Sequence, residues 1–239
     1  MKCIIKHLNA LQCHKEISKV IACIIILLLT TASACCEETE KMMDKQKRDT
    51  FLRQVQMSSW QGDDVSRNIT CFDVNEHEQI AIGMEDTHNR CYISVYDNTG
   101  QWLYGYSFVS HGTYYLEWVN AENINIYWIR SSIKGTFDAQ ANCIMLTEYK
   151  LDSSMNKKFL YLASSEKWVK NSKYYLDTNL GLLSPLALGY ARVLSLTPDG
   201  AERIIVDMTG SNIRGVIYIV CLIILIITAI IVAMKRYLH

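Results

Sequence analysis

Acidic and imidazole side chains gather in two short segments, Glu76-His77-Glu78 and Glu85-Asp86-Thr87-His88. Carboxylate and imidazole groups together suit a metal ion. Residues 79–84 between them read as a strand, and six residues at ~3.3 Å each hold the two segments roughly 20 Å apart. Neither segment alone has zinc-type spacing. We therefore interpret both as solvated turns and expect no metal site and no cofactor.

Motifs for nucleophilic or phosphate chemistry are missing from the sequence. No serine stands in Gly-x-Ser-x-Gly, and Ser110-His111-Gly112 is typical of a turn rather than of a catalytic pair. Gly181 and Gly189 flank a Leu-rich segment without the Lys-Ser/Thr of a phosphate-binding loop. A pair of carboxylates for glycoside hydrolysis stays an open alternative, because a sequence does not give the distance between two carboxylates in space.

Aromatic residues are concentrated between positions 92 and 128. One interpretation is cross-strand packing in a core. The other is an exposed Tyr/Trp surface for a protein, a peptide or a glycan, since interfaces favour these residues. For that surface the candidate binding residues are Trp102, Tyr104, Tyr106, Trp118, Tyr127 and Trp128.

The positions of the nine cysteines argue against a disulfide framework. Six lie in or beside the two apolar ends of the chain, which leaves Cys71, Cys91 and Cys143 in the central region, without a C-x-x-C motif. Buried free thiols are the expected state, and a Cys71–Cys91 bridge is the alternative.

From residue 69 onward, short alternating runs rich in Tyr, Ile, Val and Trp predict strands and turns. The clearest hairpin joins residues 91–96 and 101–108 through Asp97-Asn98-Thr99-Gly100, whose residues tolerate a positive φ. Residues 69–74 and 79–84 precede it. Together these four segments predict an antiparallel meander.

The pattern recurs twice along the chain. Residues 114–119 are expected to pair with 124–130, and residues 143–150 with 159–163. A third outer hairpin joins 190–196 and 202–206 through Thr197-Pro198-Asp199-Gly200. In that third unit the inner pair is expected to be lost, with a short helix or loop at 174–185.

The outer turns lie near positions 99, 154 and 199, close to the ~40–50 residue period of propeller blades. The predicted fold is therefore mainly β, with antiparallel blade-like meanders in a partial β-propeller-like array. Three units do not close a propeller, which has 4–8 blades. The open strand edges predict a homo-oligomer or another partner.

Both ends of the chain are apolar. Residues 20–34 follow Lys2, Lys6, Lys15 and Lys19 and end in Ala32-Ser33-Ala34, which is typical of a signal peptide. An uncleaved signal anchor and lipidation of Cys35 are the alternatives. Residues 216–234 form a run of 19 residues without a charge, followed by Lys235-Arg236, and predict a transmembrane helix.

These features divide the chain into a signal peptide or signal anchor (1–36), a charged tether (37–66), an exported β domain (67–209) and a transmembrane helix with a short cytoplasmic tail (213–236). The basic residues outside each apolar run place both tips in the cytoplasm and the centre outside. Residues 37–207 carry 23 Asp and Glu against 17 Lys and Arg, a net charge of about −6. This charge argues against nucleic acid as a partner.

Three segments of the chain carry a resemblance to known sequences: residues 93–108, Leu116-Glu117-Trp118 and residues 123–131. They resemble uncharacterised membrane proteins of Gram-positive, clostridial-type bacteria. The resemblance covers roughly residues 68–239, but residues 136–142 differ from the corresponding segment of those proteins. It implies an exported propeller-like β region and a C-terminal span, and it implies no activity.

The sequence favours a binding or sensory module that is anchored in the lipid bilayer of the cell membrane, with its central domain outside. The expected partners are the bilayer, a protein or glycan, and further copies of the chain. An exported hydrolase, whose carboxylates converge only in the folded domain, is the alternative function.

Overall fold

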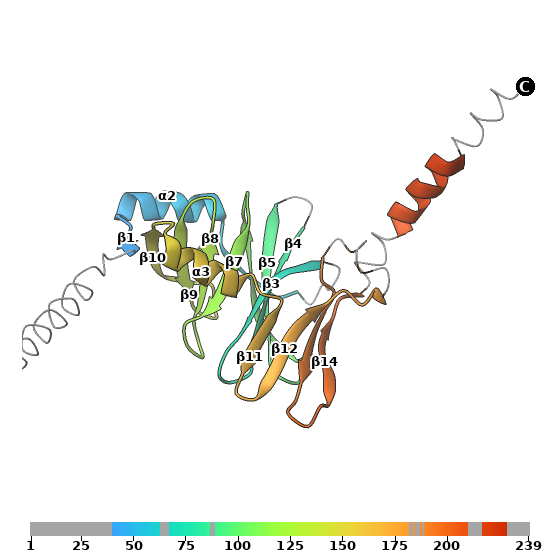
Figure 1. The fold of residues 1–239 in the computed structure, drawn as a ribbon. Coiled ribbons are helices and arrows are strands. Elements are labelled where there is room, and N and C mark those ends of the chain that lie inside the picture. Colours follow the sequence, from blue (N-terminus) through green and yellow to red (C-terminus); the bar gives the residue numbers. More distant parts are fainter. Residues whose placement is uncertain are drawn as a thin grey trace, which may run out of the picture. The chain divides into compact units, whose positions relative to one another are not determined.

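A computed structural model describes residues 40–62, 67–86, 89–181, 184, 187, 189–209 and 217–228 (Figure 1). The fold is mainly β, and its strands form three antiparallel sheets. The expected signal segment at 1–36 lies outside the described residues.

The central sheet has the strand order β2-β6-β5-β4-β3. Four consecutive strands form the expected meander, in which Ile82 lies opposite Ser94 and Ile93 opposite Tyr106. The strands are β2 (Ser58–Trp60), β3 (Asn68–Val74), β4 (Ile80–Glu85), β5 (Arg90–Tyr96) and β6 (Trp102–Val109).

Gly100 closes the turn between β5 and β6 in the left-handed conformation that the sequence predicts, with φ +86°. The Asp97 carboxylate accepts hydrogen bonds from the backbone N–H groups of Thr99 and Gln101, and the Gly100 N–H donates to the Asp97 carbonyl. A Cβ at Gly100 would lie 2.3 Å from the carbonyl oxygen of Ile205. Both the backbone angle and this close approach therefore require glycine.

The second sheet has the order β1-β10-β9-β8-β7. Its strands are β1 (Glu40–Met42), β7 (Tyr114–Trp118), β8 (Ile124–Trp128), β9 (Ile133–Phe137) and β10 (Cys143–Tyr149). The expected pairing of residues 143–150 with 159–163 is wrong, because β10 pairs with β9. The segment 159–163 instead belongs mostly to the helix α3 (Ser153–Leu162).

Helix α3 begins where the Asp152 carboxylate accepts a hydrogen bond from the Met155 N–H at 2.8 Å, an N-cap that competes with continuing the strand. Met155, Phe159 and Leu162 follow at helical spacing. They pack with Tyr127 and Tyr149 on the face of the second sheet that points away from the central sheet. This burial selects helix over strand for the segment.

The third sheet has the order β11-β12-β13-β14. The expectation that this unit lacks its inner pair is wrong. Tyr174 and Leu176 point into the core, and this alternation forms a strand in part of the segment expected to be helix or loop. The strands are β11 (Glu166–Val169), β12 (Ser172–Asp177), β13 (Arg192–Leu196) and β14 (Glu202–Asp207).

The segment expected to be a tether, residues 37–66, contributes to the folded domain. Helix α2 (Lys45–Val55) begins at Asp44, whose carboxylate accepts a hydrogen bond from Lys47 N–H at 2.9 Å. Phe51 and Val55, one helical turn apart, are buried in the core, and β1 and β2 on either side of α2 extend two of the sheets. The folded domain therefore starts well before residue 67.

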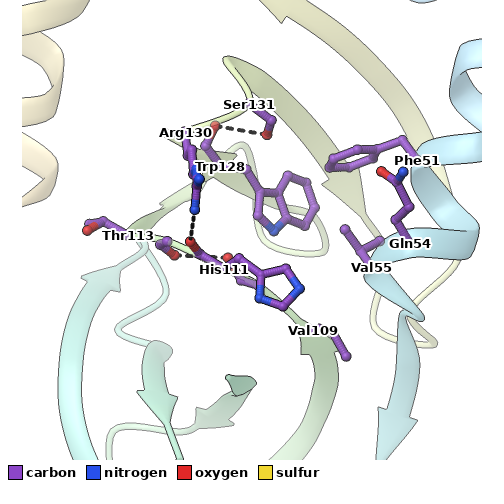
Figure 2. A pocket seen from close by; sticks show the side chains of 11 residues that line it. Phe51, Gln54, Val55, Val109, His111, Thr113, Trp128, Arg130 and Ser131 are labelled. Carbon is purple, nitrogen blue, oxygen red and sulfur yellow. Dashed lines mark hydrogen bonds between the residues drawn. The ribbon is translucent and has the colours of Figure 1, made fainter. Parts of the chain in front are cut away.

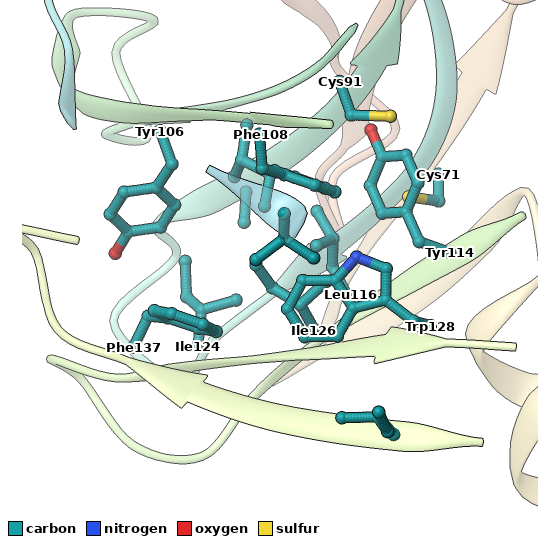
Figure 3. Packing of buried hydrophobic residues seen from close by; sticks show 14 of the residues in the cluster. Cys71, Cys91, Tyr106, Phe108, Tyr114, Leu116, Ile124, Ile126, Trp128 and Phe137 are labelled. Carbon is teal, nitrogen blue, oxygen red and sulfur yellow. The ribbon is translucent and has the colours of Figure 1, made fainter. Parts of the chain in front are cut away.

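The central sheet is buried on both faces. One face packs against the second sheet and α2 in a shared cluster that includes Ile93. Figure 3 shows Phe108, Leu116 and Trp128 of this cluster. The other face packs against the third sheet through residues such as Ile82. Because both faces are covered, β3 to β5 carry almost continuous apolar residues rather than a strict alternation.

Cys71 and Cys91 are buried free thiols, as the sequence favours, and they form no bridge. Burial raises the pKa of each thiol to about 12. Both side chains therefore behave as small apolar groups of the core.

Residues 217–228 form a helix. In the part of the chain that the structure describes, no helix combines the length and the apolar character needed to span a bilayer. The expected span at 213–236 extends on both sides beyond these described residues.

Candidate functional site

The six aromatic residues proposed from the sequence do not form one exposed surface. Tyr106, Tyr127 and Trp128 are buried, while Trp102, Tyr104 and Trp118 are half-buried. They are also divided among clusters: Tyr127 packs under α3, Trp102 against the third-sheet side, and the others around the second-sheet side. The packing of the sheets on one another, and of α3 on the second sheet, draws these side chains into the core.

Trp128 also lines a cavity of about 740 Å³, which we call the α2 pocket (Figure 2). A volume of this size is typical of small-molecule sites. The pocket lies between α2, the turn after β6 and the turn after β8. Its lining residues are Phe51, Gln54, Val55, Val109, Ser110, His111, Gly112, Thr113, Trp128, Arg130 and Ser131.

Helix α2 supplies the apolar wall of the α2 pocket. The Phe51 ring meets the Trp128 ring edge-to-face, with centroids 5.0 Å apart. Val55 follows one turn later on the same side of the helix. This packing fixes the position of α2 and leaves the indole edge of Trp128 facing the cavity (Figure 2).

The indole N–H of Trp128 is buried and finds no acceptor among the described residues. An indole nitrogen only donates. Native proteins rarely leave a buried donor unpaired, so each such group requires an explanation. The nitrogen has almost no accessible surface, so neighbouring side chains enclose it and it is not open to the cavity.

Arg130 and His111 complete the polar side of the α2 pocket, and both side chains are exposed. Arg130 Nη1 donates to the carbonyl oxygen of His111 at 3.2 Å, which places the guanidinium at the pocket. Among the described lining residues there is no Asp or Glu, so the charged side chain that faces a ligand is positive.

Ser110-His111-Gly112 is the turn expected from the sequence. The Ser110 hydroxyl donates to the carbonyl oxygen of Gly112 at 2.9 Å, and the Ser110 N–H donates to the carbonyl oxygen of Asn89. In this arrangement the serine hydroxyl stabilises the turn and does not contact the imidazole of His111 as a catalytic pair does.

A second cavity of about 510 Å³, the acidic cleft, lies beside the turns after β3 and β7. Its lining residues are Asp73, Val74, Asn75, Glu76, His77, Glu117, Trp118, Val119, Asn120, Ala121 and Tyr161. Asp73 is buried, and its carboxylate accepts a hydrogen bond from the Trp118 N–H at 2.8 Å. The buried Lys167 reaches the same region and donates to the carbonyl oxygen of Tyr161.

The surroundings of Asp73 and Glu117 in the acidic cleft shift the pKa values of these two carboxyl groups in opposite directions. Burial raises the pKa of Asp73 to about 6, and the nearby Glu117 charge adds to this rise. Burial acts in the same direction on Glu117, but hydrogen bonds from Tyr127, Lys158 and Asn125 outweigh it and lower its pKa. Glu117 is therefore the ionised member of the pair at a pH where Asp73 can carry a proton.

The two acidic segments lie at the two ends of β4. In the described residues no group of three or more His, Cys, Asp or Glu is placed to hold a metal ion. Residues 76–78 precede β4 and Glu85 ends it, so the two segments lie at opposite ends of that strand, as expected. Thr87 and His88 lie outside the described residues.

Sequence reasoning named Trp128 but missed its role in the α2 pocket, and it missed Phe51, Val55 and Arg130 as site residues. One signal was present. Trp128 ends β8 and Arg130 lies in the turn that follows, so the two are close in the chain, while Ile129 between them packs toward α3.

Comparison of this chain with protein-family models, with curated proteins and with solved structures found no match.

Proposed function

We propose that the chain is a membrane-anchored extracytoplasmic binding module and that the α2 pocket holds a small ligand. One observation carries the proposal: the α2 pocket combines a volume of about 740 Å³ with an aromatic wall and the exposed side chain of Arg130. A ligand of matching size can bury apolar surface against Phe51 and Val55 and accept hydrogen bonds from Arg130. This gives the folded domain a physical reason to bind.

The chain offers a matched pair of variants for this proposal. Trp102 also carries a buried indole N–H without an acceptor in the described part of the chain, but it does not line the α2 pocket. Trp128→Phe and Trp102→Phe therefore make the same chemical change inside and outside the site.

The test is a fragment screen by thermal stability on the full-length protein in detergent. Fragments that raise the melting temperature of the wild type should do so equally in Trp102→Phe and less in Trp128→Phe. Equal responses of all three proteins, or no stabilising fragment at all, would contradict the proposal.

Anchoring and export are supported by the uncharged run at 216–234 and by the basic apolar start of the chain. A lipid bilayer is then a constant partner. Membrane fractions of expressing cells should retain the chain after a carbonate wash, and release into the wash would contradict the anchor.

The three successive four-strand meanders support a partial β-propeller-like array. Such an array keeps open strand edges and an outer face, and the third sheet exposes Trp168 and Ile204. We therefore include self-association in the proposal. Light scattering on the solubilised full-length protein should give a mass above the monomer, and a monomer mass over a wide concentration range contradicts it.

An exported hydrolase is the second candidate function, and the acidic cleft favours it. Two carboxyl groups whose surroundings push their pKa values apart can divide the roles of acid and base. Hydrolysis of chromogenic glycosides or esters that Asp73→Asn and Glu117→Gln each abolish would support this function. Equal rates in both variants and the wild type would exclude the acidic cleft as the catalytic site.

A further inference from the structure

The α2 pocket combines donor groups with an apolar wall, and this combination narrows the chemistry of its ligand. We propose that the pocket binds a small carboxylic acid whose carboxylate is joined to a flat apolar group. This inference rests on the binding function proposed above and names the ligand class of the same site.

The polar end of the ligand is set by Arg130. Its guanidinium only donates hydrogen bonds. The described residues accept one hydrogen bond from the Arg130 guanidinium, through the carbonyl oxygen of His111, which leaves donors of its fork for a ligand. A planar carboxylate matches that fork and can accept two parallel hydrogen bonds from it.

The charge of the site favours an ionised acceptor over a neutral one. Arg130 supplies a positive charge, and the described lining residues include no carboxylate to oppose it. A single arginine balances a single negative charge, so a carboxylate suits the site better than a phosphate, which carries more charge at neutral pH.

The apolar end of the ligand is set by Phe51, Val55 and Val109. In Figure 2 these side chains lie on the other side of the Trp128 indole from Arg130. Phe51 and Trp128 offer aromatic surface at the cavity, and rings pack against such surface in offset or edge-to-face geometry. A flat apolar group beside the carboxylate therefore fills the volume that the polar end leaves.

The experiment compares acids with their amides, which have the same shape and no charge. Calorimetric titration of the full-length protein in detergent uses indole-3-acetate against indole-3-acetamide and phenylacetate against phenylacetamide. We expect each acid to bind about tenfold more tightly at low ionic strength, because its hydrogen bonds are charge-assisted. Added salt should reduce the difference in affinity between acid and amide, because Arg130 is exposed and salt screens the charges of exposed groups.

Three variants test whether the preference for the acid over the amide arises at the α2 pocket. Arg130→Gln should remove the preference for the acid while weak binding of the amide remains, and Arg130→Lys should keep part of the preference because it keeps the charge. Arg53→Gln removes a positive charge from α2 without altering a lining residue and should leave the preference intact. Melting curves of each variant show that the fold is retained.

Equal binding of acid and amide, or a preference that survives in Arg130→Gln, overturns the inference. Inorganic phosphate that displaces the acids at a similar concentration overturns it as well. If neither acid nor amide binds while other fragments bind the pocket, the ligand class is wrong and the binding function stands. If nothing binds, both proposals fail.

Discussion

Replacing Asp73 by Asn is expected to change how the stability of the protein depends on pH. Asp73 is buried at a junction between elements: Trp118 on β7 donates to its carboxylate, and Lys167 on β11 and Glu117 on β7 act on it through their charges. The oxygen of an asparagine can still accept the Trp118 hydrogen bond, so the variant removes the ionisation and keeps the contact.

The magnitude follows from the pKa. Burial raises the pKa of Asp73 from 3.8 to about 6, and this difference of about two pKa units corresponds to ~3 kcal/mol at 1.36 kcal/mol per unit. The folded protein holds this proton more tightly than the unfolded chain. As pH rises from below the unfolded pKa of 3.8 to above the folded pKa of about 6, the wild type therefore loses up to ~3 kcal/mol of unfolding free energy that the variant does not lose.

Urea denaturation of the full-length protein in detergent, followed by tryptophan fluorescence at about pH 4 and about pH 7, measures the effect. Other carboxyl groups titrate in both proteins, so the difference between them isolates Asp73. Asp97→Asn is the control with the opposite sign, because hydrogen bonds within its turn lower the pKa of Asp97. The same stability difference between Asp73→Asn and wild type at both pH values would refute the reasoning.

Further outcomes follow from the fold. Gly100→Val should lower the free energy of unfolding by more than ~1 kcal/mol and by more than Gly200→Val, because Gly200 has a similar φ of +82° but nothing within 4 Å of its added Cβ; equal effects on the melting temperature would contradict the close approach to Ile205. Cys71 and Cys91 should resist a thiol reagent at neutral pH until denaturant is added, and rapid labelling of the folded protein would contradict their burial and raised pKa. Protease added to intact cells should digest the domain at residues 69–207, and its survival beside a digested exported control would contradict the proposed topology.

Local sequence patterns were sufficient for the central meander. Strand alternation, and the Asp97–Gly100 turn with its positive φ, are decided within a few residues, and β3 to β6 appear close to the predicted positions. The outer hairpin of the third sheet was predicted for the same reason. Here the local preference and the global fold agree.

The errors arose where tertiary packing decides. Strand β9 carries Lys134, Gly135 and Thr136 at its centre, a polar run that becomes a strand because it is buried between β8 and β10. The sequence predicts a strand at residues 159–163, which overlap the end of helix α3, because apolar residues satisfy either period over so short a segment. The N-cap at Asp152 was the signal that could have distinguished them.

The α2 pocket was beyond sequence reasoning for a different reason. Its walls come from α2, from the turn after β6 and from the end of β8, segments separated by tens of residues. No spacing pattern brings Phe51, His111 and Arg130 together; only the packing of α2 onto the core does. The abundance of aromatic residues was visible, but their burial depended on how the sheets stack.

The most direct test of the binding proposal is the set of indole N–H signals in an NMR spectrum of the full-length protein labelled with ¹⁵N-tryptophan. The chain has five tryptophans, and the signal that disappears in Trp128→Phe identifies the indole that lines the α2 pocket. Addition of a bound ligand should shift that signal, because the ligand packs beside the indole, while the Trp102 signal stays in place. A ligand that binds and leaves the Trp128 signal unchanged would contradict the account.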